Sequence, residues 1–172
     1  MKRTIAEKRL PLPDLIACLA RDREDGLTVA FTNGCYDILH AGHLHLLEQT
    51  AGLADVVVVG LNGDGSVHRL KGGSRPFVLF DDRADLLAGL EMVDYVIGFD
   101  EDTPERLMEA LGPDLMVKGG DYTPETLPEK ETADRIGCRI EIVPFRSDRS
   151  TTGLVERIVK TGGGDPGRPR TR

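Results

Sequence analysis

Apolar residues recur along this chain in short β-branched runs that are separated by stretches with helical spacing. The run at 56–59 consists of four consecutive valines, which predicts a central strand that is buried on both faces. Further apolar runs have the length of strands, and the segments between them have the length of helices. We predict strands at 27–31, 56–61, 95–99, 115–117 and 139–143, and helices at 43–53, 82–90, 104–111, 128–136 and 151–160.

This alternation predicts an α/β fold. Strands that are separated by helices of about ten residues form right-handed β-α-β units, which build a parallel sheet. We therefore expect a three-layer sandwich of about five parallel strands with helices on both faces. In open sheets of this kind, ligands bind beyond the carboxyl ends of the strands.

The 172 residues suffice for one domain with a substantial core. We expect a helical lead-in over residues 1–25, with its helix at 13–23, followed by the main domain at 26–160. Residues 161–172 are rich in glycine, proline and arginine, and we expect them to form a disordered tail.

Charge and cysteine content narrow the class of protein. The 22 Lys and Arg against 29 Asp and Glu give a net charge of −7, which argues against a nucleic-acid-binding protein. Three widely separated cysteines without a C-x-x-C pair fit a reducing compartment. No apolar run is long enough to cross a bilayer, and no signal-peptide pattern is present. We expect a cytoplasmic protein without membrane contact.

Four polar clusters follow predicted strand ends, at 33–43, 62–71, 118–121 and 147–152. The first cluster brings His40 and His43, with Gly42 between them, to the start of a predicted helix. Helix N-termini attract phosphate because their first N–H groups are unpaired, and a glycine lets the anion approach the backbone. The two imidazoles could instead cap and pack the helix. A zinc site would need further ligands, and none accompanies them at suitable spacing.

The remaining clusters carry cations, hydroxyls and carboxylates. Residues 69–76 form a glycine-containing basic loop in which Lys71 and Arg75 could bind phosphate oxygens, although a solvated turn has the same composition. The P-loop pattern is absent. Lys118 could neutralise a phosphate or lie at a surface turn. Asp37 and Asp64 could hold Mg²⁺ or a ribose hydroxyl, or be plain turn residues.

Hydroxyl side chains precede the last predicted helix. The segment 150–152 is Ser-Thr-Thr, which could bind phosphate or serve as a simple helix cap. Two further histidines carry weaker signals. We expect His45 to point away from His43, as a surface or packing residue, and His68 to lie on a loop.

The segment 33–43 resembles the H-x-G-H signature of the cytidylyltransferase-like nucleotidyltransferases. Residues 150–152 stand where that superfamily has an I-S-[ST]-T-like segment, here without the isoleucine-serine start. Segments 31–43, 70–76, 101–104 and 113–122 resemble the adenylyltransferase domain of bacterial ADP-heptose synthases, except that Gly73 replaces an acidic or polar residue. The likeness extends from about residue 10 to residue 160. Many bacteria fuse this domain to a sugar kinase, and we expect the stand-alone version here.

The resemblance implies a Rossmann-like fold and an enzyme that transfers AMP from ATP to a sugar 1-phosphate. The sugar would be D-glycero-D-manno-heptose 1-phosphate, and the products would be ADP-heptose and pyrophosphate. His40, His43 and Lys71 would be catalytic, and Lys71 and Arg75 would bind the substrate phosphate. The nucleotide-binding residues would be Thr32, Asn33, Gly34, Asp37, Gly42, Asp64, Lys118, Gly120, Asp121, Ser150, Thr151 and Thr152.

The triphosphate would carry Mg²⁺, while the metal ligands that the protein supplies stay open. Homodimers are common among such proteins, although no apolar stripe in this chain demands one. One alternative is a cytidylyltransferase acting on glycerol phosphate or ethanolamine phosphate. Another is a nucleotide-sensing module without turnover, which would need a damaged H-x-G-H motif or basic loop, and both are intact.

Overall fold

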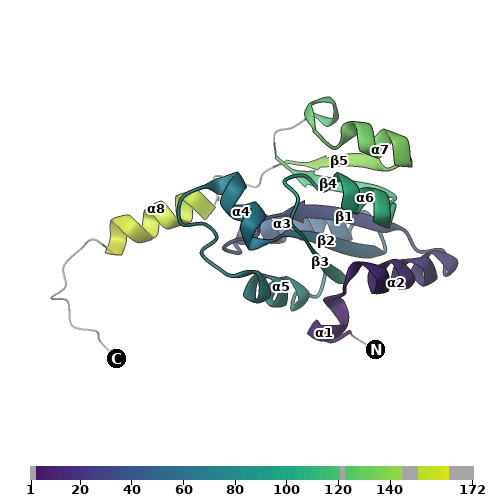
Figure 1. Cartoon of the computed structure of the whole chain (residues 1–172), viewed down its shortest axis with the longest axis horizontal. Coiled ribbons are helices and arrows are strands. Elements are labelled where there is room, and N and C mark those ends of the chain that lie inside the picture. The colour runs from purple at the N-terminus through teal and green to yellow at the C-terminus, as the bar shows by residue number, and fades with distance from the viewer. Residues whose placement is uncertain (1–2, 121–122, 145–150, 163–172) are drawn as a thin grey trace.

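Within residues 3–120, 123–144 and 151–162, which the computed structural model describes, five parallel strands form one sheet in the order β3-β2-β1-β4-β5 (Figure 1). The strands are β1 (Val29–Gly34), β2 (Val56–Asn62), β3 (Tyr95–Phe99), β4 (Leu115–Gly119) and β5 (Arg139–Val143). The helices are α1 (Ile5–Lys8), α2 (Leu12–Glu24), α3 (Ala41–Ala51), α4 (Asp64–Lys71), α5 (Phe80–Ala88), α6 (Glu105–Leu111), α7 (Lys130–Ile136) and α8 (Thr151–Gly162), with a short 3-10 turn η1 (Pro124–Thr126).

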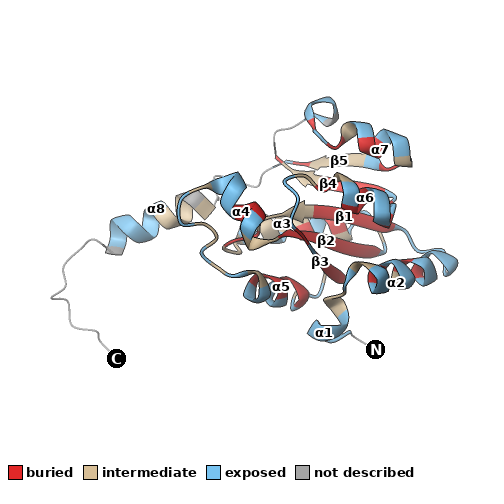
Figure 2. Cartoon of the chain, viewed as in Figure 1, coloured by how far each residue is buried: buried red, intermediate tan, exposed pale blue. Residues whose placement is uncertain are grey.

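Helices cover both faces of the sheet, and the strands are the most deeply buried elements (Figure 2). Successive valines of β2 lie on opposite faces of the sheet. Val58 packs in a cluster with residues of α2 and α6, whereas Val57 and Val59 pack with Leu47 of α3 and Leu87 of α5. A strand buried on both faces needs this unbroken apolar run. The predicted α/β fold with a five-stranded parallel sheet is confirmed.

Gly60 shows how closely the central strands pack. It lies in β2 opposite Asn33 of β1, beside the ring of Phe31. A Cβ atom on Gly60 would lie 2.7 Å from Cζ of Phe31, which is closer than real Cβ contacts. Gly60 therefore leaves the space that the Phe31 ring fills in the core.

Two local predictions differ from the structure. The first strand ends at Gly34 rather than at residue 31, because β1 stays paired with β2 through Leu61. Residues Asp64–Lys71, expected as a loop, form α4. The glycines at 63 and 65 hide this helix in the sequence, and only Ser66 and Val67 of its residues are buried. His68 and Lys71 therefore lie on a helix.

The order of the strands creates a crevice at one edge of the sheet. From the central β1 the chain first moves to β2 and β3, and it then returns to add β4 and β5 on the other side of β1. The loops that follow β1 and β4 consequently diverge, and such a switch point is where open α/β sheets bind ligands. None of the helices in the described ranges has the length and apolarity of a membrane span.

Candidate active site

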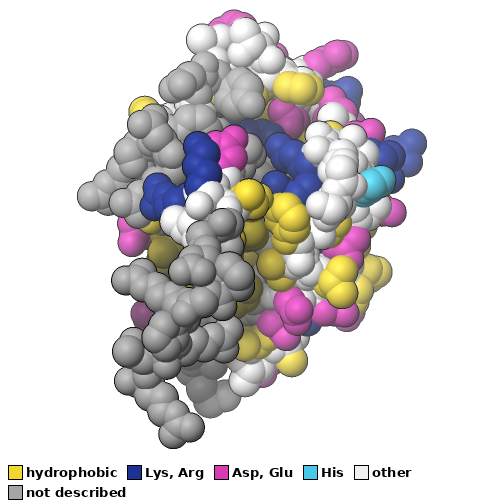
Figure 3. Space-filling model, turned by 90° about the vertical axis from the view of Figure 1, so that its left-hand side faces the viewer, with side chains coloured by type: hydrophobic (Ala, Val, Ile, Leu, Met, Phe, Trp, Pro, Cys, Tyr) yellow, Lys and Arg dark blue, Asp and Glu magenta, His cyan; other side chains and the backbone are white. Residues whose placement is uncertain are grey.

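A cleft of about 830 Å³ opens at the carboxyl ends of β1 and β4. Its lining includes residues of all four predicted polar clusters, with Thr151 at the start of α8 representing the fourth. Lys and Arg side chains gather across the upper part of the face shown in Figure 3. Predicted site residues that line the cleft are Asn33, Gly34, Asp37, His40, Gly42, His43, Lys71, Arg75, Lys118 and Thr151.

The two imidazoles of the H-x-G-H segment lie against each other at the start of α3. Their ring centroids are 3.8 Å apart and the planes are inclined by 18°. Nδ1 of His40 accepts a hydrogen bond from the Gly42 N–H at 3.1 Å, so His40 is the N-cap of α3. The neutral His40 ring therefore carries its proton on Nε2, which leaves that N–H as a donor.

Burial keeps both rings uncharged. It lowers the pKa of His40, and burial together with the neighbouring His40 lowers the pKa of His43 to about 3. At neutral pH the site thus presents two neutral imidazoles. A bound phosphate would favour their protonated forms, because a nearby negative charge raises the pKa of an imidazole.

The ring of Tyr36 packs against the ring of His43. The backbone of Tyr36 has φ +44°, an unusual value for a residue other than glycine. The tyrosine ring folds over Gly34, where a Cβ would lie 3.2 Å from Tyr36 Cε2, and its centroid is 4.9 Å from that of His43. Burial raises the pKa of the Tyr36 hydroxyl to about 12. A larger residue at position 34 would require the Tyr36 ring to shift by a few tenths of an ångström.

Several buried polar atoms of this strand-loop-helix unit have no hydrogen-bond partner among the residues that the structure describes. They are Oγ1 of Thr32, Oδ1 of Asn33, the hydroxyl of Tyr36 and Nδ1 of His43. Buried polar atoms normally have a partner, so the side chains of Asn33 and His43, which line the cleft, are available to a ligand or to ordered water. Their position around the imidazole pair marks this end of the cleft as the candidate reaction centre.

We predict that His43 makes the stability of the folded chain sensitive to acid. Its pKa of about 3 lies below the ordinary value of 6.5, so between these values only the unfolded chain binds the proton. The free energy of unfolding should therefore fall by about 1.4 kcal/mol for each pH unit below 6.5. Urea unfolding at pH 7 and pH 5.5 should show a larger loss in the wild type than in His43→Asn. The exposed His68→Asn is the control, and equal losses in all three chains would contradict the prediction.

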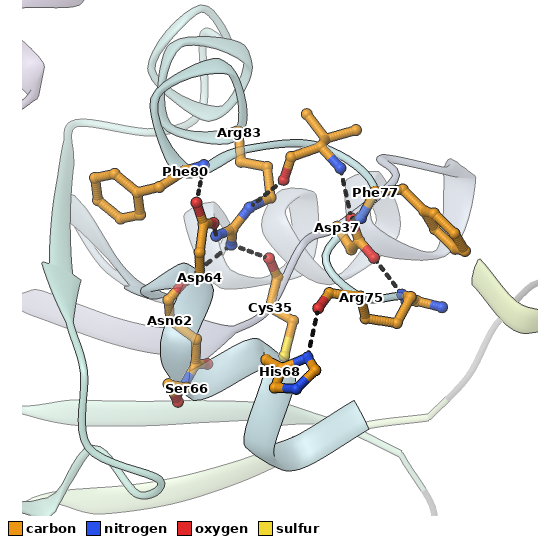
Figure 4. A network of polar contacts seen from close by, with 11 residues as sticks. Cys35, Asp37, Asn62, Asp64, Ser66, His68, Arg75, Phe77, Phe80 and Arg83 are labelled. Atoms are coloured by element: carbon orange, nitrogen blue, oxygen red, sulfur yellow. Dashed lines mark hydrogen bonds and ion pairs between the residues drawn. The ribbon is translucent and has the colours of Figure 1, made fainter. Parts of the chain in front are cut away.

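Asp37 lines the cleft and also has a structural role. Its buried carboxylate accepts hydrogen bonds from the backbone N–H groups of Phe77 and Val78, at 2.7 and 2.9 Å, and is ion-paired with Nε of Arg75 (Figure 4). Both oxygens thus already have partners within the protein, and the role of Asp37 as a ligand for Mg²⁺ or ribose stays a prediction. Arg75 still lines the cleft, with its guanidinium also 4.7 Å from the centroid of the Phe77 ring.

We predict that Asp37→Asn loosens the segment 75–78. The substitution removes the charge that holds Arg75, whose side chain is only 15% exposed. A loss of about 1.5–3 kcal/mol in the free energy of unfolding is expected, the range for hydrogen bonds to charged groups. Urea unfolding measures the loss, and limited proteolysis should show faster cleavage near this segment. Asp82→Asn, at an exposed carboxylate of α5, should change neither result, and wild-type stability of Asp37→Asn would refute the role.

Asp64 belongs to a second structural network, centred on the fully buried Arg83. Its carboxylate accepts from the Arg83 guanidinium at 2.6 Å, and Asp64 does not line the cleft (Figure 4). Arg83 also donates to the backbone carbonyls of Cys35, Asn62 and Val78. One guanidinium thus joins the ends of β1 and β2 to α5, while the nucleotide contact of Asp64 stays a prediction.

The two predicted lysines differ in their surroundings. Lys71 is exposed at the last residue of α4, and it forms no ion pair with any residue of the described ranges. Lys118 instead pairs with the buried Glu129, with 2.6 Å between Nζ and Oε1. Glu129 thus pairs with Lys118 inside the cleft, and the contact of Lys118 with a phosphate stays a prediction. Lys71 is the more readily available of the two to an anion.

The other predicted nucleotide-binding residues lie outside the cleft lining or outside the described residues. Thr32 is fully buried and lies outside the cleft lining, as does Gly120, whose N–H donates to the carbonyl of Val143 at 3.0 Å. Asp121 and Ser150 lie outside the described residues, as does the side chain of Thr152.

Sequence reasoning missed several residues of the cleft, among them His45 and Glu129. His45, expected as a surface or packing residue, is half-buried and lines the cleft. Its position three residues after Gly42 on the same helix could have revealed this, since such residues share a face. Glu129 also lines the cleft, but its pairing with a strand 11 residues earlier leaves no local signal. Among the described residues, no three His, Cys, Asp or Glu side chains are grouped to hold a metal ion.

Most of the chain is similar to proteins of a known family. The family model described as cytidylyltransferase-like matches residues 31–156. The bifunctional protein HldE of Syntrophotalea carbinolica is 50% identical over 138 residues, which are 80% of this chain and 28% of that protein. The chain thus spans less than a third of the length of this relative.

Two solved structures share the fold. The lipopolysaccharide core biosynthesis protein of Thermoplasma volcanium has a TM-score of 0.58 and 28% identity, over 72% of this chain and 100% of that one. The pantoate-beta-alanine ligase of Francisella tularensis has a TM-score of 0.53 at 14% identity, over 80% and 67% of the two chains. The second likeness concerns the fold alone.

Proposed function

The chain belongs to the cytidylyltransferase-like family, and on this basis we propose that it transfers AMP from ATP to D-glycero-D-manno-heptose 1-phosphate. An oxygen of the sugar phosphate attacks the α-phosphorus of ATP. The bond between this phosphorus and the oxygen that bridges to the β-phosphate breaks, and pyrophosphate leaves with that oxygen. ADP-heptose is the other product.

The observation that carries the proposal is the stacked imidazole pair at the start of α3, inside the cleft. Protein groups contribute to phosphoryl chemistry mainly by positioning and by stabilising charge. Nε2–H of His40 is a donor that can stabilise the negative charge that develops on the departing oxygen. His43 can donate from a ring nitrogen in the same way, and no covalent histidine intermediate is required.

Lys71 supports the approach of two anions. The attacking phosphate and the triphosphate repel each other, and an ammonium group between them offsets this repulsion. Lys71 has the freedom to move there because Gly72 and Gly73 follow it, both with positive φ values of +64° and +61°. Arg75, held by Asp37, lines the same side of the cleft.

Magnesium enters this scheme as part of the substrate. The described residues form no cluster of metal ligands, and the two carboxylates first considered are occupied by arginines. The phosphate oxygens of ATP themselves bind Mg²⁺, which neutralises part of their charge. We therefore propose MgATP as the nucleotide substrate, with Thr151 and the N-terminus of α8 near its outer phosphates.

The sugar assignment is supported by the 50% identity to bifunctional protein HldE and by the likeness of segments 70–76 and 113–122 to ADP-heptose synthase domains. A cytoplasmic location, where ATP and reduced cysteines coexist, belongs to the same proposal, and so does a homodimer. An activity on glycerol phosphate or ethanolamine phosphate with CTP is the competing assignment within the family.

A screen of pyrophosphate release tests the function. The four nucleoside triphosphates are crossed with sugar 1-phosphates, glycerol phosphate and ethanolamine phosphate, and the His40→Ala/His43→Ala chain serves as the control for contaminating enzymes. Release with ATP and heptose 1-phosphate alone is the expected result. Release with CTP and an alcohol phosphate would replace the assignment. The absence of release with every pair would contradict catalysis.

A further inference from the structure

One buried carboxylate in the cleft takes no part in the phosphate chemistry described above. The side chain of Glu129 is only 4% exposed, and Oε1 is paired with Nζ of Lys118. Oε2 is also buried, yet it has no hydrogen-bond partner in the described structure. An ionised carboxylate offers about four acceptor positions, and burying one with a single partner is unfavourable. Glu129 is therefore built to receive a further donor.

The backbone position of Glu129 strengthens this point. The residue directly precedes α7, where a negative charge interacts favourably with the first N–H groups of the helix. No side-chain hydrogen bond to these groups is present. The carboxylate lines the cleft beside the end of β4, so the fold places it there although a local partner is at hand.

Charge and polarity decide which part of a nucleotide fits this end of the cleft. The Lys118–Glu129 pair is neutral overall, whereas Lys71, Arg75 and the start of α3 offer donors to anions elsewhere in the same cleft. The lining also includes the apolar side chains of Leu46, Leu127 and Val143. An uncharged group with N–H or O–H donors and an apolar face meets these conditions, and a phosphate does not.

We infer that Oε2 of Glu129 accepts a hydrogen bond from the nucleoside of bound ATP, with Lys118 holding the carboxylate in place. The donor is either the exocyclic amino group of the base or a ribose hydroxyl, since both present the same chemistry to a carboxylate. This inference rests on the proposed function. It adds a specificity-determining residue that binds the nucleoside rather than the phosphates.

Isothermal titration without sugar phosphate tests the inference on the whole chain. The ligands are the magnesium complexes of ATP, of ITP, which lacks the amino group, and of 2′-deoxy-ATP and 3′-deoxy-ATP, which each lack one hydroxyl. The analogue that lacks the donor should bind about 10- to 100-fold more weakly than ATP, as expected when a bond to a charged group is lost. Its identity reveals which donor Glu129 binds.

The variant Glu129→Ala should remove this difference, because the acceptor is gone. Glu131→Ala, at an exposed carboxylate in the first turn of α7, is the matched control and should keep it. Equal affinity of the unmodified chain for all four nucleotides would overturn the inference without any variant. Retention of the full difference in Glu129→Ala, or a change confined to the KM of the sugar phosphate, would overturn it as well.

Failure of the proposed function would look different. A chain that binds ATP but releases no pyrophosphate with any substrate pair contradicts the reaction and leaves the nucleoside contact measurable. Thermal unfolding of Glu129→Ala, compared with Glu131→Ala, identifies a loss of binding that comes from misfolding. In that event, Glu129→Gln, which keeps the size of the side chain, takes the place of Glu129→Ala in the analogue series.

Discussion

Replacing His43 by alanine is expected to lower kcat by roughly 10²- to 10³-fold, the usual effect of removing one preorganised donor to a developing oxyanion. The ring is fixed on two sides, by the stacked His40 and by Tyr36, so it needs no reorganisation during the reaction. Because its main contribution is to the transition state, the affinity for ATP should change much less than kcat.

Pyrophosphate release under saturating substrates measures the effect, and titration with MgATP measures the affinity. His68→Ala removes an exposed imidazole from α4 and should leave both values unchanged. Tyr36→Phe keeps the ring behind His43 and removes only the hydroxyl, so it should retain most of the activity. Turnover of His43→Ala close to that of the wild type would refute the catalytic role.

The sequence was sufficient for the fold because its strongest signals are local. The valine run at 56–59 predicts a doubly buried strand by itself, and four similar runs set the remaining strands. The imidazole pair could be placed as well, since a strand, a tight loop and a helix start follow one another within 31–43. The fold was predictable from hydrophobic periodicity, and the imidazole pair was predictable because its residues are adjacent in the sequence.

The charged residues of the cleft could not be assigned in this way. Asp37 is paired with Arg75, which lies 38 residues later in the chain. Lys118 is likewise paired with Glu129, on a different element. A carboxylate that binds an arginine and one that binds Mg²⁺ look alike in a sequence. The pairings arise only when the loops after β1, β2 and β4 meet, so the sequence predicted the location of the polar residues better than their partners.

Lys71→Ala is expected to lower kcat/KM for the sugar phosphate by roughly 10²- to 10³-fold, with a smaller effect on the affinity for ATP. The residue occupies the end of α4, where a lysine also interacts favourably with the helix dipole. That structural role accounts for only about 0.3–1 kcal/mol and does not involve substrates. The two roles therefore differ in what they change, namely kinetics or stability.

A pair of variants separates these roles. Lys71→Arg keeps the charge at the helix end and should preserve stability, but a planar guanidinium cannot replace a compact ammonium between two phosphates without loss of kcat. Arg69→Ala removes a cation from the same helix that is already paired with Asp102, so its kinetics should stay close to those of the wild type. If Lys71→Ala loses stability while kcat/KM is unchanged, the lysine stabilises α4 and the anions must be held by other donors.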